Sequence, residues 1–171
     1  GKTSDTFLND LTQSVTYNNF GKYEYTNMTD KAAKYKGFTG DDVTAIPGFV
    51  NYSEGIYVGY KFYETASDEG LIDYDDTVAF PFGYGLSYTS FDQKLDSVKY
   101  KGGKVTVTAT VTNTGSKAGK DVVEVYYNPP YTDGGIEKAS RNLAGFEKTK
   151  ELKPGESQKV TVEFDDDDMA S

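Results

Sequence analysis

One stretch of this chain constrains its fold more than any other, because residues 105–112 alternate strictly between small apolar side chains and threonine. Valine or alanine occupies every odd position, and threonine occupies every even position. Successive side chains of a β-strand point to opposite faces, so this order places all the apolar groups on one face. The stretch therefore predicts an antiparallel strand with one buried face and one face toward water.

The second half of the chain contains further strand candidates between turn signals. Turns are indicated at 113–116, at the prolines of 128–130 and at 153–156, where proline and glycine set the backbone angles. Short strands with frequent turns predict a β-sandwich. An immunoglobulin-like sandwich has about seven strands, so five predicted strands make it incomplete, and we expect the others to follow Ser171. The four further candidates are residues 95–100, 122–127, 141–148 and 160–164.

The first 77 residues show weaker patterns. Residues 1–50 are polar and rich in turn signals, which predicts loops with one or two short elements. Residues 56–60 alternate as a strand would, although a single helical turn at Tyr60–Thr65 competes with that interpretation. Residues 66–77 read as an acidic loop.

Residues 79–91 form a segment in which five aromatic rings surround one proline and two glycines. Glycine adopts backbone angles that strain other residues, and aromatic rings contribute much of the burial energy where units meet. We therefore expect a sharp bend in a buried place that joins two structural units. The triplet Gly83–Gly85 lacks the third glycine and the following helix of a dinucleotide-binding loop, so a packed bend is favoured.

Composition excludes several classes of function. The formal net charge of −9 disfavours nucleic acid as a partner. The chain has no cysteine and no histidine, which excludes thiolate metal sites and histidine-dependent catalysis. No apolar run approaches the length of a membrane span. We expect no cofactor, no bound metal, no nucleic acid and no membrane partner.

Several strings resemble glycoside hydrolase family 3, the β-glucosidase family. Residues 51–64 and 79–91 agree in order and spacing with the end of the family's second catalytic domain. The opening residues 1–7 resemble the stretch that follows the last helix of that domain. Residues 143–148 and 152–157 resemble recurrent strings of the family's fibronectin type III-like domain. The resemblance covers most of the chain and is weakest over residues 22–48.

The resemblance implies a β-rich chain of two parts. Residues 1–92 would form the loop-rich tail of an α/β sandwich domain, and residues 93–171 an immunoglobulin- or fibronectin type III-like β-sandwich truncated at its C-terminus. It also implies a parent enzyme that hydrolyses terminal β-linked sugars, most often glucose, with retention through a covalent glycosyl-enzyme. That chemistry needs no cofactor, and the carbohydrate would bind through other parts of the parent.

A retaining glycosidase needs two carboxylates, and Glu54 and Glu64 stand inside the resembling string. The family, however, places its nucleophile, an aspartate, in the first domain and its acid/base glutamate ahead of the segment that begins at Gly1. The resemblance therefore implies no catalytic residue here, and we interpret Glu54 and Glu64 as structural, either capping or ion-paired. The isolated chain is predicted to be inactive.

Other candidate sites have simpler interpretations. Tyr17, Tyr23 and Tyr25 could stack on sugar rings, but tyrosine is frequent in this chain, and packing is favoured. Residues 73–76 and 165–168 are acidic, yet neither has the spacing of an EF-hand, so we expect solvated runs. The triplets at Asn27 and Asn51 fit the glycosylation pattern, which means little without a secretory context.

Two alternatives to the enzyme fragment stay open at this point. One is a non-catalytic β-sandwich that binds carbohydrate or protein, and the other is a purely structural or interaction module. The sequence predicts a soluble chain but leaves open a cytoplasmic or secreted location. Sugar and linkage specificity, the domain order of the parent and the oligomeric state are also open.

Overall fold

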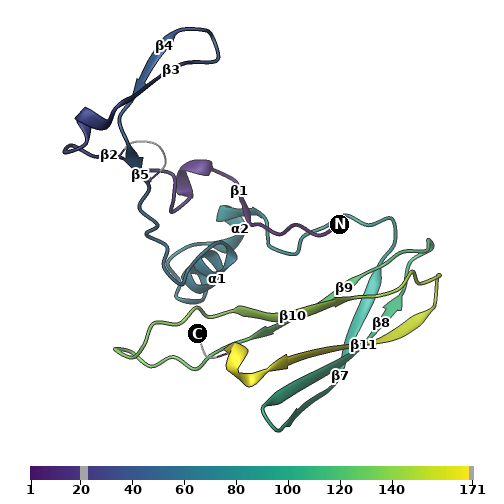
Figure 1. The fold of residues 1–171 in the computed structure, drawn as a ribbon. Helices are drawn as coiled ribbons and strands as arrows, with labels where there is room; N and C mark the ends of the chain where they lie inside the picture. Colours follow the sequence, from purple (N-terminus) through teal and green to yellow (C-terminus); the bar gives the residue numbers. More distant parts are fainter. Residues whose placement is uncertain (20–22, 170–171) are drawn as a thin grey trace.

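The computed structural model describes residues 1–19 and 23–169 and is rich in β-strands (Figure 1). Five strands of the second half form two packed sheets. The first half holds two α-helices and three small strand pairs. Figure 1 shows helix α1 lying beside strand β10, so the two halves meet there. The predicted β-rich class and the sandwich are confirmed.

All five strands predicted for the second half are present. One sheet has the order β11-β8-β7, with β7 at Phe91–Lys101, β8 at Lys104–Asn113 and β11 at Ser157–Asp165. The other sheet pairs β9 (Val122–Tyr127) with β10 (Asn142–Lys148). Each neighbouring pair is antiparallel. The predicted turn at 153–156 is also confirmed, since the Glu156 N–H donates to the Lys153 carbonyl at 2.9 Å.

The core of the sandwich follows the alternation read from the sequence. Every odd position of β8 from Val105 to Asn113 is buried, and every threonine between them is partly exposed. Val111 and Leu152 are completely buried and lie in one cluster with Val123 and Val160. Burial of a valine or leucine side chain stabilises a fold by about 1.5–3 kcal/mol. The period of two in the sequence thus marks the face that packs.

The sandwich is open on one side. A trough of about 530 Å³ lies against both sheets, and apolar side chains such as Leu95, Val98, Val125 and Phe164 line it. Leu95 and Val98 are 62% and 60% exposed, which is unusual for apolar residues that border a core. In the described part of the chain, β9 pairs only with β10, so its other edge has no neighbour.

Two predictions between residues 56 and 77 are wrong. Residues 56–60 form no strand, and helix α1 spans Tyr60–Asp68, so the competing helical interpretation holds. The acidic loop predicted at 66–77 contains the end of α1 and helix α2 (Tyr74–Thr77), which Asp73 caps by accepting the Asp76 N–H at 3.1 Å. Packing decides here, because α1 buries Tyr63 and Ala66 although its aromatic residues favour strands.

Residues 1–50 hold more structure than the one or two elements predicted. The hairpin of β3 and β4 projects away from the rest of the chain in Figure 1. All four β3 residues are exposed, and the alternation of Ala33 and Tyr35 with lysine covers only these four residues, so it is a weak signal for a strand. The short elements outside the sandwich sheets and α-helices are β1 (Phe7–Leu8), η1 (Leu11–Gln13), β2 (Tyr23–Glu24), η2 (Thr29–Lys31), β3 (Ala33–Lys36), β4 (Asp42–Ala45), β5 (Gly48–Phe49), β6 (Val78–Phe80) and η3 (Asp166–Met169).

The segment after β6 bends as predicted but is not buried as predicted. Gly83 has a φ of 78°, and the Tyr84 N–H donates to the Pro81 carbonyl at 3.1 Å, so a tight turn forms. Yet Leu86 and Tyr88 are 86% and 98% exposed. A run of rings shows that a segment can pack, but it does not show which surface is available to cover it. No helix among the described residues is long and apolar enough to cross a membrane.

Candidate functional site

Side chains from three distant parts of the chain converge where α1 meets the sandwich. They come from α1, from the bend after β6, and from the sandwich, where strand β9 and the residue just before β10 contribute. Together they line a cavity of about 440 Å³, which we call the junction pocket. Its lining residues are Tyr60, Glu64, Phe82, Glu124, Tyr126 and Arg141.

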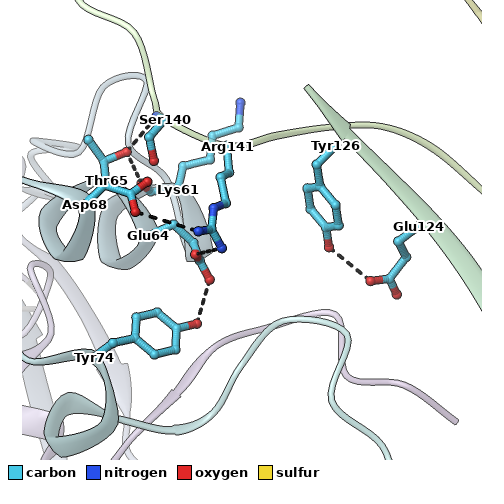
Figure 2. A network of polar contacts seen from close by, with 9 residues as sticks. All are labelled: Lys61, Glu64, Thr65, Asp68, Tyr74, Glu124, Tyr126, Ser140 and Arg141. Atoms are coloured by element: carbon cyan, nitrogen blue, oxygen red, sulfur yellow. Dashed lines mark hydrogen bonds and ion pairs between the residues drawn. The ribbon is translucent and has the colours of Figure 1, made fainter. Parts of the chain in front are cut away.

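Glu64 is the centre of a polar network across this junction (Figure 2). Its side chain is 18% exposed, and one carboxylate oxygen pairs with Arg141 Nη1 at 2.7 Å. The other oxygen accepts a hydrogen bond from the Tyr74 hydroxyl at 2.7 Å. Arg141 also lies 3.7 Å from Asp68. Both oxygens of Glu64 therefore have partners, and this carboxylate joins α1, α2 and the sandwich.

Glu124 of β9 has a similar role toward the bend. It accepts a hydrogen bond from the Tyr126 hydroxyl at 3.0 Å and lies 3.9 Å from Lys2 Nζ. The backbone of Gly83 approaches it so closely that a Cβ atom there would lie 2.5 Å from Glu124 Oε2. Glycine at this position thus allows the bend to contact the strand.

Aromatic rings form the apolar part of the same junction. The ring of Tyr60 packs against Phe82 and Tyr126, with centroid separations of 4.7 Å and 6.0 Å. Its hydroxyl accepts a hydrogen bond from the Leu143 N–H at 2.7 Å. Ring pairs in such geometries contribute about 0.5–1.5 kcal/mol beyond the area they bury. Helix, bend and strand are therefore connected by rings as well as by charges.

The electrostatics of the junction keep its tyrosines protonated. Burial raises the pKa of Tyr126, and the negative charge of Glu124 beside it adds to the effect. Burial likewise raises the pKa of Tyr74, and its hydrogen bond to Glu64 raises it further. A hydroxyl with a raised pKa is a poor proton donor in catalysis near neutral pH. These groups therefore act as hydrogen-bond donors that hold the carboxylates in place.

Asn113 fastens the bend to the sandwich, a role that the sequence did not reveal. Its side chain is completely buried. The amide nitrogen donates to the carbonyls of Lys117 and Leu152 at 2.7 Å and 2.8 Å. The amide oxygen accepts from the Thr89 hydroxyl at 2.7 Å and from the Gly115 N–H at 3.0 Å. In the sequence, Asn113-Thr114-Gly115 predicts only a turn. No local pattern indicates that the Asn113 side chain contacts Thr89, which lies 24 positions earlier.

A second cavity lies between α1 and the loop 128–140, which connects β9 to β10. It has a volume of about 450 Å³, and we call it the loop pocket. Two contacts hold its walls together: the Ser140 N–H donates to the Thr65 hydroxyl at 3.0 Å, and the Tyr57 hydroxyl donates to Glu137. The hydrogen bond to Glu137 raises the pKa of Tyr57 to about 12.

The two glutamates of the resembling string have different contacts in the structure. Glu64 belongs to the junction network, as the ion-paired interpretation expected. Glu54 lies in the turn before α1, where its carbonyl accepts the Tyr57 N–H at 2.9 Å. None of the hydrogen bonds or ion pairs found among the described residues links the Glu54 carboxylate to the junction.

The remaining candidates are spread over the surface. Tyr23 and Tyr25 pack on Phe49, with centroid separations of 5.3 Å and 5.0 Å, while Tyr17 is 46% exposed. The acidic run 165–168 is not simply solvated, since Tyr100 donates to Asp166 at 2.6 Å. Within residues 1–19 and 23–169, no three acidic side chains lie close enough to hold a metal ion.

Comparison with known proteins relates this architecture to one family. A fibronectin type III-like domain model matches residues 121–171. A β-glucosidase of Ruminococcus albus is 48% identical over 120 residues, which are 70% of this chain and 12% of the relative. The structure of β-glucosidase 3B from Thermotoga neapolitana in complex with glycerol aligns with 99% of this chain at a TM-score of 0.72 and 34% identity. The chain is homologous to a segment of the family 3 β-glucosidases.

A further similar solved structure is that of the Bifidobacterium adolescentis GH3 β-glucosidase, where GH3 stands for glycoside hydrolase family 3. It aligns with 81% of this chain at a TM-score of 0.56 and 34% identity. The chain spans only 20% of the Thermotoga structure and 18% of the Bifidobacterium structure. The match to the Thermotoga family 3 enzyme nevertheless extends over both halves of the chain, so the junction falls inside the shared region.

Proposed function

We propose that this chain is a non-catalytic part of a retaining β-glucosidase that hydrolyses terminal β-linked sugars. One observation carries the proposal: almost the whole chain aligns with a family 3 β-glucosidase structure. Glu64 and Glu124 are each held by partners of their own, Glu64 by Arg141 and Tyr74 and Glu124 by Tyr126 and Lys2. This supports the structural role, because a nucleophile or an acid/base needs a carboxylate that can reach the substrate. The carbohydrate substrate binds through other parts of the enzyme.

The domain boundary belongs to the same proposal and lies near residue 92. Residues 1–92 are the end of an α/β sandwich domain, and residues 93–171 belong to a fibronectin type III-like domain. The start of β7 at Phe91 supports this boundary, because β7 pairs with β8 along most of its length. In this arrangement the junction network connects the two domains and fixes how the end of the first one is held.

A chimera tests the proposal. Residues 1–171 replace the aligned segment of the Thermotoga β-glucosidase 3B, and hydrolysis of an aryl β-glucoside is measured. We expect the chimera to be active, and NMR of the first product to show the β-anomer, as retention requires. The isolated chain should show no hydrolysis above buffer.

The matched controls are the unchanged Thermotoga enzyme and chimeras that carry Glu54→Gln or Glu64→Gln. If these residues are not catalytic, the folded variants should keep kcat within about threefold of the parent chimera, far from the loss of many orders of magnitude that follows removal of a catalytic group. A folded but inactive chimera would contradict the proposal. So would turnover by the isolated chain that Glu54→Gln or Glu64→Gln abolishes.

A further inference from the structure

The loop pocket has the volume and the walls of a small-molecule site. Its volume of about 450 Å³ lies within the range of roughly 300–1,000 Å³ that is usual for ligand pockets. Its apolar lining includes Phe62 of α1, Leu71 of the turn after α1, and the rings of Tyr57 and Tyr131. Tyr131 is 44% exposed, so a ligand can reach part of its ring. Small-molecule sites typically combine such walls with a few charged groups that select the ligand.

The charged groups of the loop pocket are mainly negative. The carboxylates of Glu69, Asp133 and Glu137 line it, against one ammonium group, that of Lys138. This ammonium group donates a hydrogen bond to the Pro130 carbonyl at 2.9 Å, so the loop itself already provides it with a partner. Three carboxylates and one ammonium group leave an excess of two negative charges. The pocket therefore attracts a cation and repels an anion.

Two of these carboxylates have no partner within the part of the chain that the structure describes. Glu137 accepts a hydrogen bond from the Tyr57 hydroxyl, whereas the side chains of Glu69 and Asp133 form neither a hydrogen bond nor an ion pair there. The hydrogen bond to Glu137 is the largest cause of the raised pKa of Tyr57, and the charges of Glu137 and Glu69 add to it. The negative potential thus extends to the aromatic wall, and Glu69 and Asp133 can accept hydrogen bonds from a ligand.

The distribution of the carboxylates favours an organic cation over a metal ion. A calcium ion needs six or more oxygen ligands at about 2.3–2.6 Å. No three acidic side chains of residues 1–19 and 23–169 lie close enough together to hold a metal ion. An organic ammonium ion needs only one carboxylate for a charge-assisted hydrogen bond, and its apolar body can pack on the rings. The negative face of a tyrosine or phenylalanine ring also attracts a cation.

We propose that the loop pocket binds an organic cation, in which an ammonium group is attached to an apolar body. The ammonium group donates to the carboxylate of Glu69 or Asp133, and the apolar body packs on Tyr131 and Phe62. This proposal goes beyond the proposed function, because it assigns a ligand to a cavity that takes no part in the hydrolysis of a β-linked sugar.

Titration of the ¹⁵N-labelled 171-residue chain with three ligands of similar shape tests the proposal. The ligands are benzylammonium, benzyl alcohol and benzoate, which are positive, neutral and negative at pH 7. We expect benzylammonium to cause saturable shifts of the amides around Glu69, Tyr131 and Glu137, with a Kd on the order of 1–10 mM. Benzyl alcohol should bind about tenfold more weakly, and benzoate should cause no saturable shift. An increase in NaCl from about 0.02 M to about 0.3 M should weaken benzylammonium binding, because salt screens exposed charges.

Removal of the two carboxylates without partners gives a second test. Glu69→Gln/Asp133→Asn should weaken benzylammonium binding about tenfold, because it removes two negative charges from the pocket. Both side chains are exposed, so we expect the variant to fold like the parent chain. Asp92→Asn/Glu151→Gln makes the same change in net charge at exposed positions outside the pocket and is the matched control.

Three results would overturn the proposal: no saturable shift with benzylammonium, equal or tighter binding of benzyl alcohol, or equal affinities of the two double variants. The last would show that binding follows the net charge of the chain and not the pocket. The Thermotoga chimera carries the same pocket and gives a measurement in a larger protein. Benzylammonium should raise its Tm, and Glu69→Gln/Asp133→Asn should reduce that rise, whereas an equal rise in both would contradict the assignment.

Discussion

At the scale of single residues, Asn113 is the side chain on which the junction of bend and sandwich depends most directly. It is completely buried and has four hydrogen bonds. Asn113→Ala leaves two carbonyls, a hydroxyl and an N–H without this partner, so we expect a loss of about 2–4 kcal/mol in the free energy of unfolding. Urea denaturation measures the loss, and Asn27→Ala at an exposed position is the control. A loss equal to that of Asn27→Ala would contradict the assignment.

Because of Tyr74, we expect the free energy of unfolding to change with pH in the alkaline range. Burial and the hydrogen bond to Glu64 raise the pKa of Tyr74 in the folded chain above the usual tyrosine value of 10.0. The raised pKa means that Tyr74 stabilises the fold fully below pH 10 and loses this contribution as pH rises through the folded-state value.

Tyr74→Phe should therefore cost about 1–2 kcal/mol near neutral pH, from the lost hydrogen bond to a carboxylate. The difference between the variant and the parent chain should shrink at high pH, as thermal unfolding measured from pH 8 upward would show. Tyr88→Phe, at a position 98% exposed, should follow the parent chain throughout. A difference that stays constant with pH would show that Tyr74 does not couple to Glu64.

At the scale of elements, the bend and the loop between β9 and β10 each contain one of a matched pair of glycines. Gly83 and Gly134 have nearly equal φ angles of 78° and 77°. A Cβ at Gly83 would contact Glu124, whereas a Cβ at Gly134 would meet nothing within 4 Å. Gly134→Ala should cost only the backbone strain of about 1–2 kcal/mol, and Gly83→Ala should cost more, because Glu124 must leave Tyr126.

Chemical denaturation of both variants measures this difference. The double variant Gly83→Ala/Glu124→Ala separates the two causes, because the clash disappears with the Glu124 side chain. We expect its loss to be smaller than the sum of the two single losses. Equal losses for Gly83→Ala and Gly134→Ala would mean that the bend does not press on β9.

At the scale of the whole molecule, the open side of the sandwich governs behaviour in solution. The trough exposes Leu95 and Val98, and β9 has one edge without a described neighbour. Exposed apolar surface and free strand edges both promote association. We expect the 171-residue chain to self-associate and to unfold with low cooperativity.

Sedimentation velocity over a range of concentrations measures the association. Leu95→Lys/Val98→Lys should reduce it, because charges on an exposed strand oppose edge and face pairing. Asp92→Lys, on the same strand outside the trough lining, also changes the net charge by +2 and is the control for the change in charge. A monomeric chain with a cooperative, reversible transition would contradict this expectation.

The sequence by itself determined the five strands of the sandwich and the turns between them. The alternation at 105–112 predicted which face of β8 is buried, because a half-buried strand must alternate in polarity. The resemblance of residues 51–64 and 79–91 likewise pointed to the family that the comparisons show. Both signals are local, so they can be read without knowing what lies beside them in space.

Only the tertiary structure decided how these pieces meet. Residues 56–60 alternate like a strand, yet the chain enters α1 at Tyr60, because that helix can bury Tyr63 and Ala66 against distant segments. The pairing of Glu64 with Arg141 and the hydrogen bonds of Asn113 likewise join residues far apart in the chain. The strands could be predicted because the alternation of side chains within each strand shows which of its faces is buried. The junction could not, because it depends on partners that no local pattern specifies.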